Sequence, residues 1–365
     1  MRPLKILFTN NTLATRAGSE LWVRDVAIAL QRRGHEPAAY SPYLGEVAGE
    51  LRAGGVPVVD DLDLLPWRPD LVHGHHHLET MAALARFPGV PGVFVCHGAV
   101  PFEEEPPLHP RLLRYVAVDE PCRERIAAAG VPGSRTLTIP NFVDLARFPP
   151  RAPLPERPAR ALVFSHNLGE GDGLRIIRKA CRGAGIELEA LGTAAGRVSA
   201  RPEEELRRAD LVFARARAAL EAVATGCAVV LCDARGLGPL VTAEEFPALR
   251  ALNLGFRTLT EPITSASVAR RIAEYRPAAA ARASARARAE AGLDAAVDAL
   301  AGTYAEVLAE PVPEDAEAEG RAFSRHLQGL SVRIKEFDAL RRERDALAAE
   351  LGAAPVSLSK WWRRF

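Results

Sequence analysis

The sequence predicts an α/β protein with two doubly wound domains that face a cleft, followed by a helical tail. Three observations predict this fold. Short apolar runs alternate with helical patterns, a proline-rich segment interrupts the alternation, and a second series of the same kind follows it. With 365 residues, the chain is long enough for about two domains and their cores.

The first series begins with an apolar run over residues 4–9, a polar loop and a helical pattern that ends at Gly34. This arrangement is a βα unit. Strands alternating with helices pair in parallel, so we expect one sheet within residues 1–148. The pattern predicts further strands at 35–41, 56–59, 70–74, 92–96 and 114–118, and a helix at 44–53.

A run of prolines separates the two series, at Pro132, Pro140, Pro149, Pro150, Pro153, Pro155 and Pro158. No helix interior or central strand accepts prolines at this density, so we place the domain boundary here. The second domain, 149–310, shows the same alternation. It predicts strands at 161–165, 186–191, 209–214 and 228–233, and helices at 174–181 and 217–224.

Composition limits the classes of partner. Lys and Arg number 47 against 46 Asp and Glu, so the net charge is +1 and no basic field predicts a nucleic-acid partner. The five cysteines form no Cys-x-x-Cys pair, which argues against a disulfide framework. The N-terminus lacks a signal-peptide pattern and no apolar run reaches ~18 residues, so we expect a cytoplasmic protein.

Residues 311–365 differ in character from the rest. An acidic linker leads to Phe323, Leu327, Leu330, Ile334 and Phe337, which recur at heptad spacing. This seam is equally compatible with a coiled coil, which would allow self-association, and with an amphipathic helix packed on its own protein. The chain ends in a basic and aromatic cluster suited to a membrane surface, comprising Lys360, Trp361, Trp362, Arg363, Arg364 and Phe365.

The polar loop after the first predicted strand is a candidate binding site. Ligands of open α/β sheets bind at the carboxyl ends of strands, where helix N-terminal amides face anionic or hydroxyl groups. Gly18 and Ser19 lie in this loop, and His97 follows another predicted strand. We expect Gly18 to allow close approach of a ligand and His97 to face the cleft, where a neutral imidazole can donate and accept hydrogen bonds.

Several segments, in order, resemble the GT-B-fold glycosyltransferases of family 4. The likeness spans about residues 3–310 and rests on the order of the motifs more than on any one of them. The matching segments are Lys5-Ile-Leu-Phe, Gly18-Ser-Glu, Leu30-Gln-Arg-Arg-Gly-His-Glu, Asp70-Leu-Val-His-Gly-His, Val95-Cys-His-Gly, Ile139-Pro-Asn-Phe-Val-Asp and Leu220-Glu-Ala-Val-Ala-Thr-Gly-Cys-Ala-Val-Val.

The resemblance implies a hexosyl-type transfer from a nucleotide-sugar donor to a glycan or lipid-linked glycan acceptor, with retention and without a metal cofactor. It implies that Glu221 binds the ribose diol, that His97 is catalytic, and that Gly236 and Gly238 lie in a donor-binding loop. His73, His75 and His77 would share one face of a strand, as zinc ligands can. Relatives carry histidines there without a metal, so we predict no metal site.

The chain also departs from the family. Phe213 stands where the family has its first glutamate, Leu240 replaces an acidic residue, and residues 164–173 lack the Arg and Lys that neutralise the donor pyrophosphate. A diphosphate leaving group needs positive charge or a helix N-terminus. We therefore predict that Arg215 clamps the diphosphate, with help from His166.

These departures leave other hypotheses open. One is a non-catalytic GT-B protein that serves as a scaffold, and another is a GT-B nucleotide-sugar epimerase. The compact segment up to Glu221 also resembles the inverting GT-B enzyme that adds N-acetylglucosamine to the lipid-linked peptidoglycan precursor. Inversion is therefore an alternative to retention.

The tail resembles those of bacterial surface-polysaccharide glycosyltransferases. It carries Glu343-Arg-Asp-Ala-Leu and then Ser357-Leu-Ser-Lys-Trp-Trp-Arg-Arg. The resemblance implies peripheral binding at the cytoplasmic face of the inner membrane.

Deleting residues 353–365 should release the protein from anionic vesicles, because this removes the basic and aromatic cluster. Vesicle co-sedimentation measures the effect, and neutral vesicles serve as the control. Unaltered binding to anionic vesicles would contradict this role for the tail.

Overall fold

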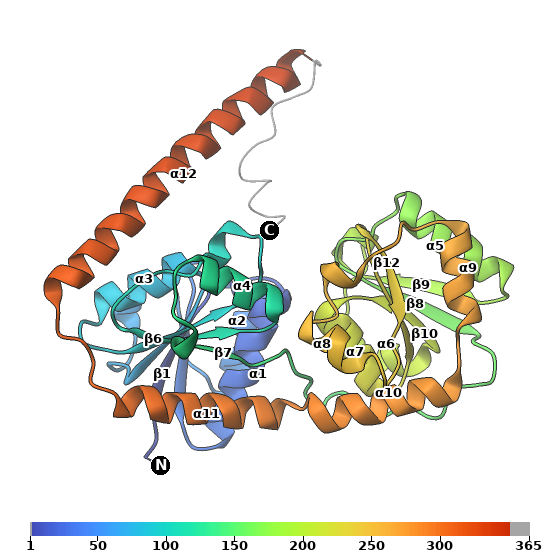
Figure 1. Ribbon diagram of the computed structural model, residues 1–365, viewed down its shortest axis with the longest axis horizontal. Helices are drawn as coiled ribbons and strands as arrows, with labels where there is room; N and C mark the ends of the chain where they lie inside the picture. The colour runs from blue at the N-terminus through green and yellow to red at the C-terminus, as the bar shows by residue number, and fades with distance from the viewer. Residues whose placement is uncertain (1, 351–365) are drawn as a thin grey trace. The chain divides into compact units, whose positions relative to one another are not determined.

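The computed structural model describes residues 2–350. The internal contacts divide the chain into two units, residues 1–106 with 111–312 and residues 107–110 with 313–365. The larger unit contains two sheets covered by helices (Figure 1). The predicted α/β class with two doubly wound sheets is therefore confirmed.

The first sheet has seven parallel strands in the order β3-β2-β1-β4-β5-β6-β7. Its central strands are buried along their length, as expected for a parallel sheet covered on both faces. The strands are β1 (Lys5–Thr9), β2 (Glu36–Tyr40), β3 (Val58–Val59), β4 (Leu71–His75), β5 (Gly92–Cys96), β6 (Leu112–Ala117) and β7 (Thr136–Thr138).

Five helices pack on this sheet: α1 (Gly18–Arg32), α2 (Glu46–Ala53), α3 (His77–Arg86), α4 (Glu120–Ala128) and α11 (Leu293–Ala309). Helix α1 packs against both α2 and α11, whereas α3 contacts β4 and α4 contacts β6. Helix α11 follows the second sheet in the sequence but lies along the first (Figure 1). The hydroxyl of its buried Tyr304 lies 2.5 Å from Nδ1 of His73 on β4.

The second sheet has the order β12-β11-β10-β8-β9. Its strands are β8 (Arg160–Phe164), β9 (Glu187–Leu191), β10 (Leu211–Ala214), β11 (Ala228–Asp233) and β12 (Gly236–Leu240). Strand β12 is antiparallel to β11, because the short connection between them permits only a hairpin.

The sequence-based expectation of a loop at Gly236 and Gly238 is therefore wrong. Backbone on the open side of β12 also approaches both glycines. A Cβ at Gly236 would lie 2.6 Å from the carbonyl oxygen of Glu261, and one at Gly238 would lie 2.6 Å from that of Thr258. These glycines allow close backbone packing at the edge of the sheet.

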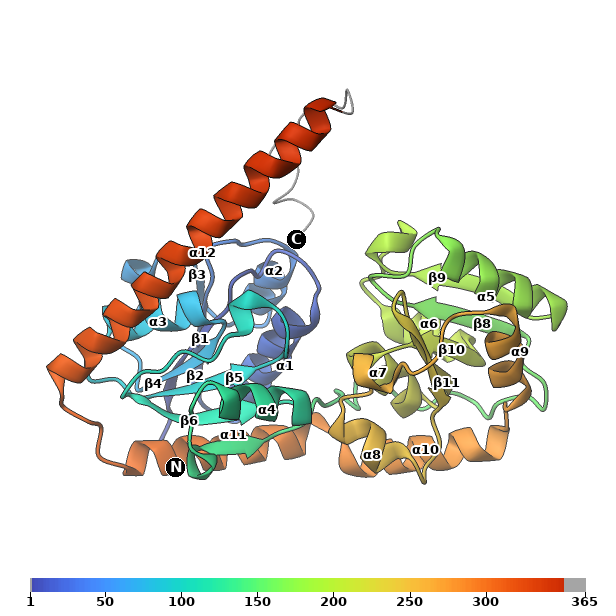
Figure 2. The same cartoon turned by 45° about the horizontal axis from the view of Figure 1, so that its top comes forward.

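Two hydrophobic cores cover opposite faces of the second sheet, because successive residues of a strand point to opposite sides. Leu211 and Phe213 of β10 belong to one core, and Val212 and Ala214 belong to the other. Helices α5 (Asp172–Gly183) and α9 (Ser265–Ala273) pack together over the first core (Figure 2). The second core contains residues of α6 (Pro202–Arg208), α7 (Ala216–Thr225), α8 (Phe246–Ala251) and α10 (Pro277–Glu290).

The strand order reverses once in each sheet, between β1 and β4 and between β8 and β10. The helices that follow the two strands at such a reversal lie on opposite faces of the sheet. This leaves a crevice between them at the carboxyl ends of the strands. The loops that follow β1, β8 and β10 are therefore the segments most exposed to a ligand.

The smaller unit consists of α12 (Ala316–Glu350) and the segment 107–110. The ring of His109 packs edge-on against Phe323, with 5.1 Å between ring centroids. Leu327, Ile334 and Phe337 of the heptad seam are exposed. Self-association through this helix remains a prediction.

Among residues 2–350, no helix has the length and apolar character needed to span a bilayer. The proposed membrane-binding cluster, with Lys360, Trp361, Trp362, Arg363, Arg364 and Phe365, lies outside the described residues.

Gly192, directly after β9, has φ +144°, and a Cβ on it would meet the carbonyl oxygen of Ser165 at 1.9 Å. We expect Gly192→Ala to lower the free energy of unfolding by about 2 kcal/mol or more, because it combines backbone strain with a backbone clash. Gly183→Ala, in α5 and with open space around the added Cβ, is the control and should be neutral or stabilising. Urea denaturation measures both, and equal stability of the two variants would contradict the expectation.

Candidate functional site

A pocket of about 200 Å³ lies where the strand order of each sheet reverses. Three segments form most of its wall: residues 16–18 after β1, residues 164–167 at the end of β8, and residues 215–218 at the start of α7. Leu21 and Glu221 complete it. The structure therefore brings together four residues predicted from the sequence, namely Gly18, His166, Arg215 and Glu221.

A smaller hollow of about 40 Å³ shares part of this wall. Both are lined by Arg16, Leu21, Phe164, His166 and Glu221. The hollow adds a mainly apolar surface formed by Leu191, Gly192, Val198, Ser199 and Pro202, together with Arg147 and Phe148. Glu221 thus lies where the pocket meets the hollow.

The N-terminus of α7 opens into the pocket. No side chain caps this helix, and its first residue, Ala216, has the left-handed φ of +49° that is rare for residues other than glycine. The N–H of Ala216 donates to the carbonyl oxygen of Leu254 at 2.8 Å, whereas amides that stay free in the first turn of a helix carry partial positive charge and attract anions. Helix α1 also lacks a side-chain cap, and a Cβ on Gly18 would meet nothing within 4 Å.

Glu221 is buried, with 5% of its surface exposed. Nε of Arg217, one helical turn before it, donates to Oε1 of Glu221 at 2.8 Å. Burial raises the pKa of Glu221, and the Arg217 guanidinium opposes that rise. Arg217 therefore holds one oxygen of the carboxylate.

Arg217 also pairs with Asp25 of α1, so that one guanidinium links the two carboxylates. Nε of Arg24 donates to Asp25 at 2.8 Å, and Arg24 pairs with Glu50 of α2 at 2.6 Å. Burial alone would lower the pKa of Arg217, but Asp25 and Glu221 raise it above its ordinary value. Burial alone would raise the pKa of Asp25, but the two arginines lower it.

Arg215, the expected diphosphate clamp, lines the pocket but pairs with the buried carboxylate of Asp233 at the end of β11. About a third of its side chain is exposed. Arg16 likewise pairs with Glu50. Each of the three arginines that line the pocket therefore has a carboxylate partner, and an anionic ligand must share these cations.

His166 lies on the pocket wall with Nδ1 3.0 Å from the Thr193 hydroxyl. Its pKa is lowered by burial and by the charge of Arg215. His166 is therefore neutral at pH 7, so it can donate a hydrogen bond but adds no positive charge.

His97 follows β5 and is not among the residues that line the pocket. Its Nε2 lies 2.6 Å from Nδ1 of His75, and its backbone N–H donates to Glu104 at 2.8 Å. Burial lowers the pKa of His97 to about 4. The charge of Glu104 opposes this by raising the pKa, whereas the charges of His76 and Arg217 lower it further. His97 is therefore neutral and lies within electrostatic reach of Arg217 on the pocket wall.

The histidine cluster differs from its prediction. Strand β4 ends at His75, His76 has φ +61°, and His77 begins α3. Only His73 and His75 share a strand face, where their rings stack, so the expectation that His77 joins them is wrong. Within residues 2–350, no group of three or more His, Cys, Asp or Glu is arranged to hold a metal ion.

The remaining predicted residues lie away from the pocket wall. Ser19 donates from Oγ to Glu20 at 2.9 Å, and Gly236 and Gly238 belong to β12. Sequence reasoning missed Asp25 and Asp233 as partners of the pocket arginines. The i,i+4 spacing of Arg217 and Glu221 was a readable signal for one of these contacts.

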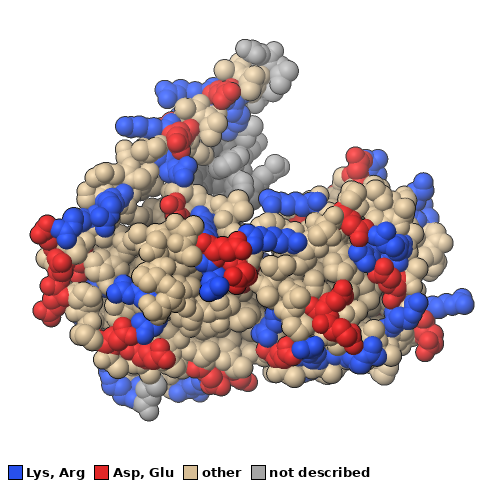
Figure 3. All heavy atoms as spheres, viewed as in Figure 1, with Lys and Arg blue, Asp and Glu red and all other residues tan. Residues whose placement is uncertain are grey.

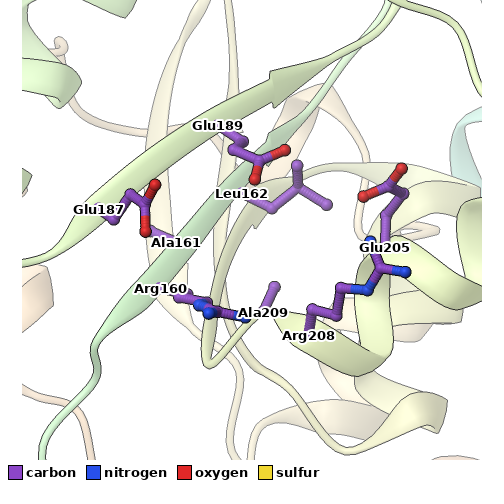
Figure 4. A pocket seen from close by; sticks show the side chains of 8 residues that line it. All are labelled: Arg160, Ala161, Leu162, Glu187, Glu189, Glu205, Arg208 and Ala209. Carbon is purple, nitrogen blue, oxygen red and sulfur yellow. The ribbon is translucent and has the colours of Figure 1, made fainter.

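On the face shown in Figure 3, Lys and Arg are interspersed with Asp and Glu. A separate hollow of about 40 Å³ has room for little more than water. It is lined by Arg160, Ala161, Leu162, Glu187, Glu189, Glu205, Arg208 and Ala209, from β8, β9 and the end of α6 (Figure 4).

Comparison with known proteins identifies this architecture. Residues 16–147 match the model of Glycosyltransferase Family 4. A glycosyltransferase of Rickettsia africae superposes with a TM-score of 0.63 at 12% identity, covering 85% of this chain and all of that one. The chain has the GT-B fold, and its residues 16–147 resemble Glycosyltransferase Family 4.

Two other proteins share this fold. Anabaena HepE in complex with UDP-glucose gives a TM-score of 0.56 at 16% identity, with 83% of this chain and 100% of that chain covered. A putative UDP-N-acetylglucosamine 2-epimerase of Listeria monocytogenes gives 0.55 at 13% identity, with 86% and 99% covered. No curated protein matches the sequence of this GT-B chain.

We expect Asp233→Asn to tighten binding of a nucleoside diphosphate about fivefold, because it releases Arg215 from a competing carboxylate.

Arg215→Ala should abolish nucleotide-sugar binding while leaving the fold intact. Isothermal titration calorimetry measures affinity and circular dichroism monitors the fold. In the Arg215→Ala background, Asp233→Asn should give no gain. Unchanged nucleotide affinity in Arg215→Ala would exclude the clamp.

Proposed function

We propose that this protein transfers a hexosyl group from a nucleotide-sugar donor to a glycan or lipid-linked glycan acceptor. One observation carries the proposal: a buried carboxylate, Glu221, lies beside an uncapped helix N-terminus in a pocket at the strand-order reversals. Carboxylates accept paired hydroxyl groups, and helix N-termini accept phosphates. Ribose and diphosphate are adjacent in a nucleotide sugar.

The donor would bind with its ribose hydroxyls on the free oxygen of Glu221 and its diphosphate at the start of α7. Arg215 and His166 would contact the diphosphate, and the apolar hollow beside Leu191 and Pro202 would receive the base. Negative charge that develops on the departing diphosphate would be stabilised by the α7 amides and Arg215. HepE binds UDP-glucose, so a UDP-sugar is the first donor to test.

The acceptor would enter from the side of the first sheet, near Gly18 and His97. We propose that His97 contacts the transferred sugar, that the reaction retains configuration and that it needs no metal cofactor. Peripheral binding to the inner membrane through the tail would bring the enzyme to a lipid-linked acceptor in polysaccharide biosynthesis.

Two other functions have specific support. A GT-B epimerase is supported by the fold shared with the putative UDP-N-acetylglucosamine 2-epimerase, and would convert its nucleotide sugar without an acceptor. A non-catalytic scaffold is supported by the carboxylate partners of Arg16, Arg215 and Arg217. Analysis of products made without an acceptor separates epimerase from transferase.

Thermal unfolding with a panel of nucleotides and nucleotide sugars tests the donor site. A ligand at 100 times its Kd adds about 2.7 kcal/mol to the free energy of unfolding. We expect one nucleoside diphosphate and its sugars to raise Tm selectively. Glu221→Gln should weaken that ligand by about 10- to 100-fold, because it removes a charged acceptor.

Glu187→Gln, on an exposed position of β9 outside the pocket, is the matched control and should keep the shift. An absence of any shift across the panel would favour the scaffold. A shift that persists in Glu221→Gln would place the nucleotide elsewhere.

A further inference from the structure

The imidazoles of the buried His73 and His75 and of the partly buried His97 lie in a row at the carboxyl end of the first sheet. The ring centroids of His73 and His75 lie 4.8 Å apart, as do those of His75 and His97. Trp22 of α1 packs against all three rings, and Phe8 of β1 packs against His73. Each imidazole is therefore held in a fixed orientation by aromatic neighbours.

All three imidazoles are neutral at pH 7. Burial lowers the pKa of His73 to about 3, that of His97 to about 4 and that of His75 well below its ordinary value. A neutral imidazole carries one N–H and one lone pair, so the position of a single proton decides what each ring can do.

Nδ1 of His75 and Nε2 of His97 lie 2.6 Å apart and share one hydrogen bond. Nε2 of His75 is buried and has no hydrogen-bond partner within the part of the chain that the structure describes. If His75 carried its proton on Nε2, a buried N–H would be left without an acceptor. Orphaned buried N–H groups are rarer than unsatisfied acceptors, which favours the proton on Nδ1.

His73 shows the same pattern. Its Nδ1 lies 2.5 Å from the Tyr304 hydroxyl, and its buried Nε2 has no partner among residues 2–350. Because the Tyr304 hydroxyl is itself a donor, either direction of this hydrogen bond leaves one buried donor without an acceptor, the Nε2–H of His73 or the O–H of Tyr304.

We propose that His75 is a positioning residue whose Nδ1–H donates to Nε2 of His97 and fixes His97 as the Nδ1–H tautomer. This inference deepens the proposed function and rests on it where it assigns His97 to the transferred sugar. With Nε2 occupied as an acceptor, His97 presents an N–H to a sugar hydroxyl oxygen and has no lone pair left to take a proton. His97 therefore orients the sugar as a donor and is not a general base.

The remaining neighbours of His97 fit this role. Glu104 accepts a hydrogen bond from the backbone N–H of His97, which holds the backbone of this residue in place. Glu104 also pairs with His76, so its charge is shared, while Arg217 adds positive charge near the ring. This arrangement disfavours a proton-accepting imidazole at His97 and leaves its neutral donor form.

Long-range ¹H–¹⁵N correlation spectra of the full chain, labelled with ¹⁵N-histidine, test the proposal directly. His97 is assigned by comparison with His97→Asn. We expect its Nε2 to resonate as a non-protonated nitrogen and its Nδ1 as a protonated one at neutral pH. A protonated Nε2 would overturn the proposal, whatever the protein's activity.

A pair of variants separates positioning from packing. His75→Asn keeps an amide donor near the position of Nδ1, whereas His75→Leu removes the hydrogen bond. We expect His75→Leu to give His97 a mixture of tautomers and to lower kcat about tenfold with little change in KM. His75→Asn should restore the wild-type spectrum and most of kcat.

If folded His75→Leu keeps the wild-type nitrogen shifts of His97, the proposal is overturned. The spectra require no substrate. An intact tautomer signature in a protein that binds no nucleotide would therefore refute the proposed function and leave the assignment of His75 standing.

Discussion

The buried ion chain from Glu221 through Arg217 to Asp25 is the interaction on which the rest of the site depends. Charges removed from water are tolerated only when they are paired and hydrogen-bonded. Arg217 meets that condition by contacting both carboxylates, and it thereby joins α7 of the second sheet to α1 of the first. The orientation of Glu221 and the contact between the two helices are thus one structural feature. Loss of one partner would leave an uncompensated buried charge and would lower the free energy of unfolding by about 3–5 kcal/mol.

Charge pairing also bears on how the proposed donor site would work without the family's usual cations. The arginines that line it are bound to carboxylates, whereas the N-terminus of α7 has no side-chain cap and keeps its partial positive charge. In the proposed donor site, backbone amides of α7 would take the diphosphate, because residues 164–173 contain no Lys or Arg. Phe213, in the place of the family's first glutamate, is part of the hydrophobic core and contributes only packing.

The sequence predicted the features set by local pattern. Alternation of apolar runs and helices predicted most strands. The rule that ligands bind after the strands of open sheets predicted Gly18, and the resemblance to family 4 predicted Glu221. Strand β7 was missed because a strand of three residues is too short to show a periodic pattern. The packing of α11 on the first sheet was missed because the pattern of a helix does not say which sheet it covers. The pairs Asp25–Arg217 and Asp233–Arg215 join residues far apart in sequence, and only the folded chain brings them together. The stacking of His75 on His97 is hidden for the same reason.

A crystal structure with a bound nucleoside diphosphate tests the central claim most directly. We predict ribose hydroxyls on Glu221 while Arg217 still bridges Glu221 and Asp25, with the diphosphate at free amides in the first turn of α7 and Arg215 turned from Asp233 toward it. A nucleotide bound away from Glu221, or a diphosphate that leaves the α7 N-terminus untouched, would contradict it.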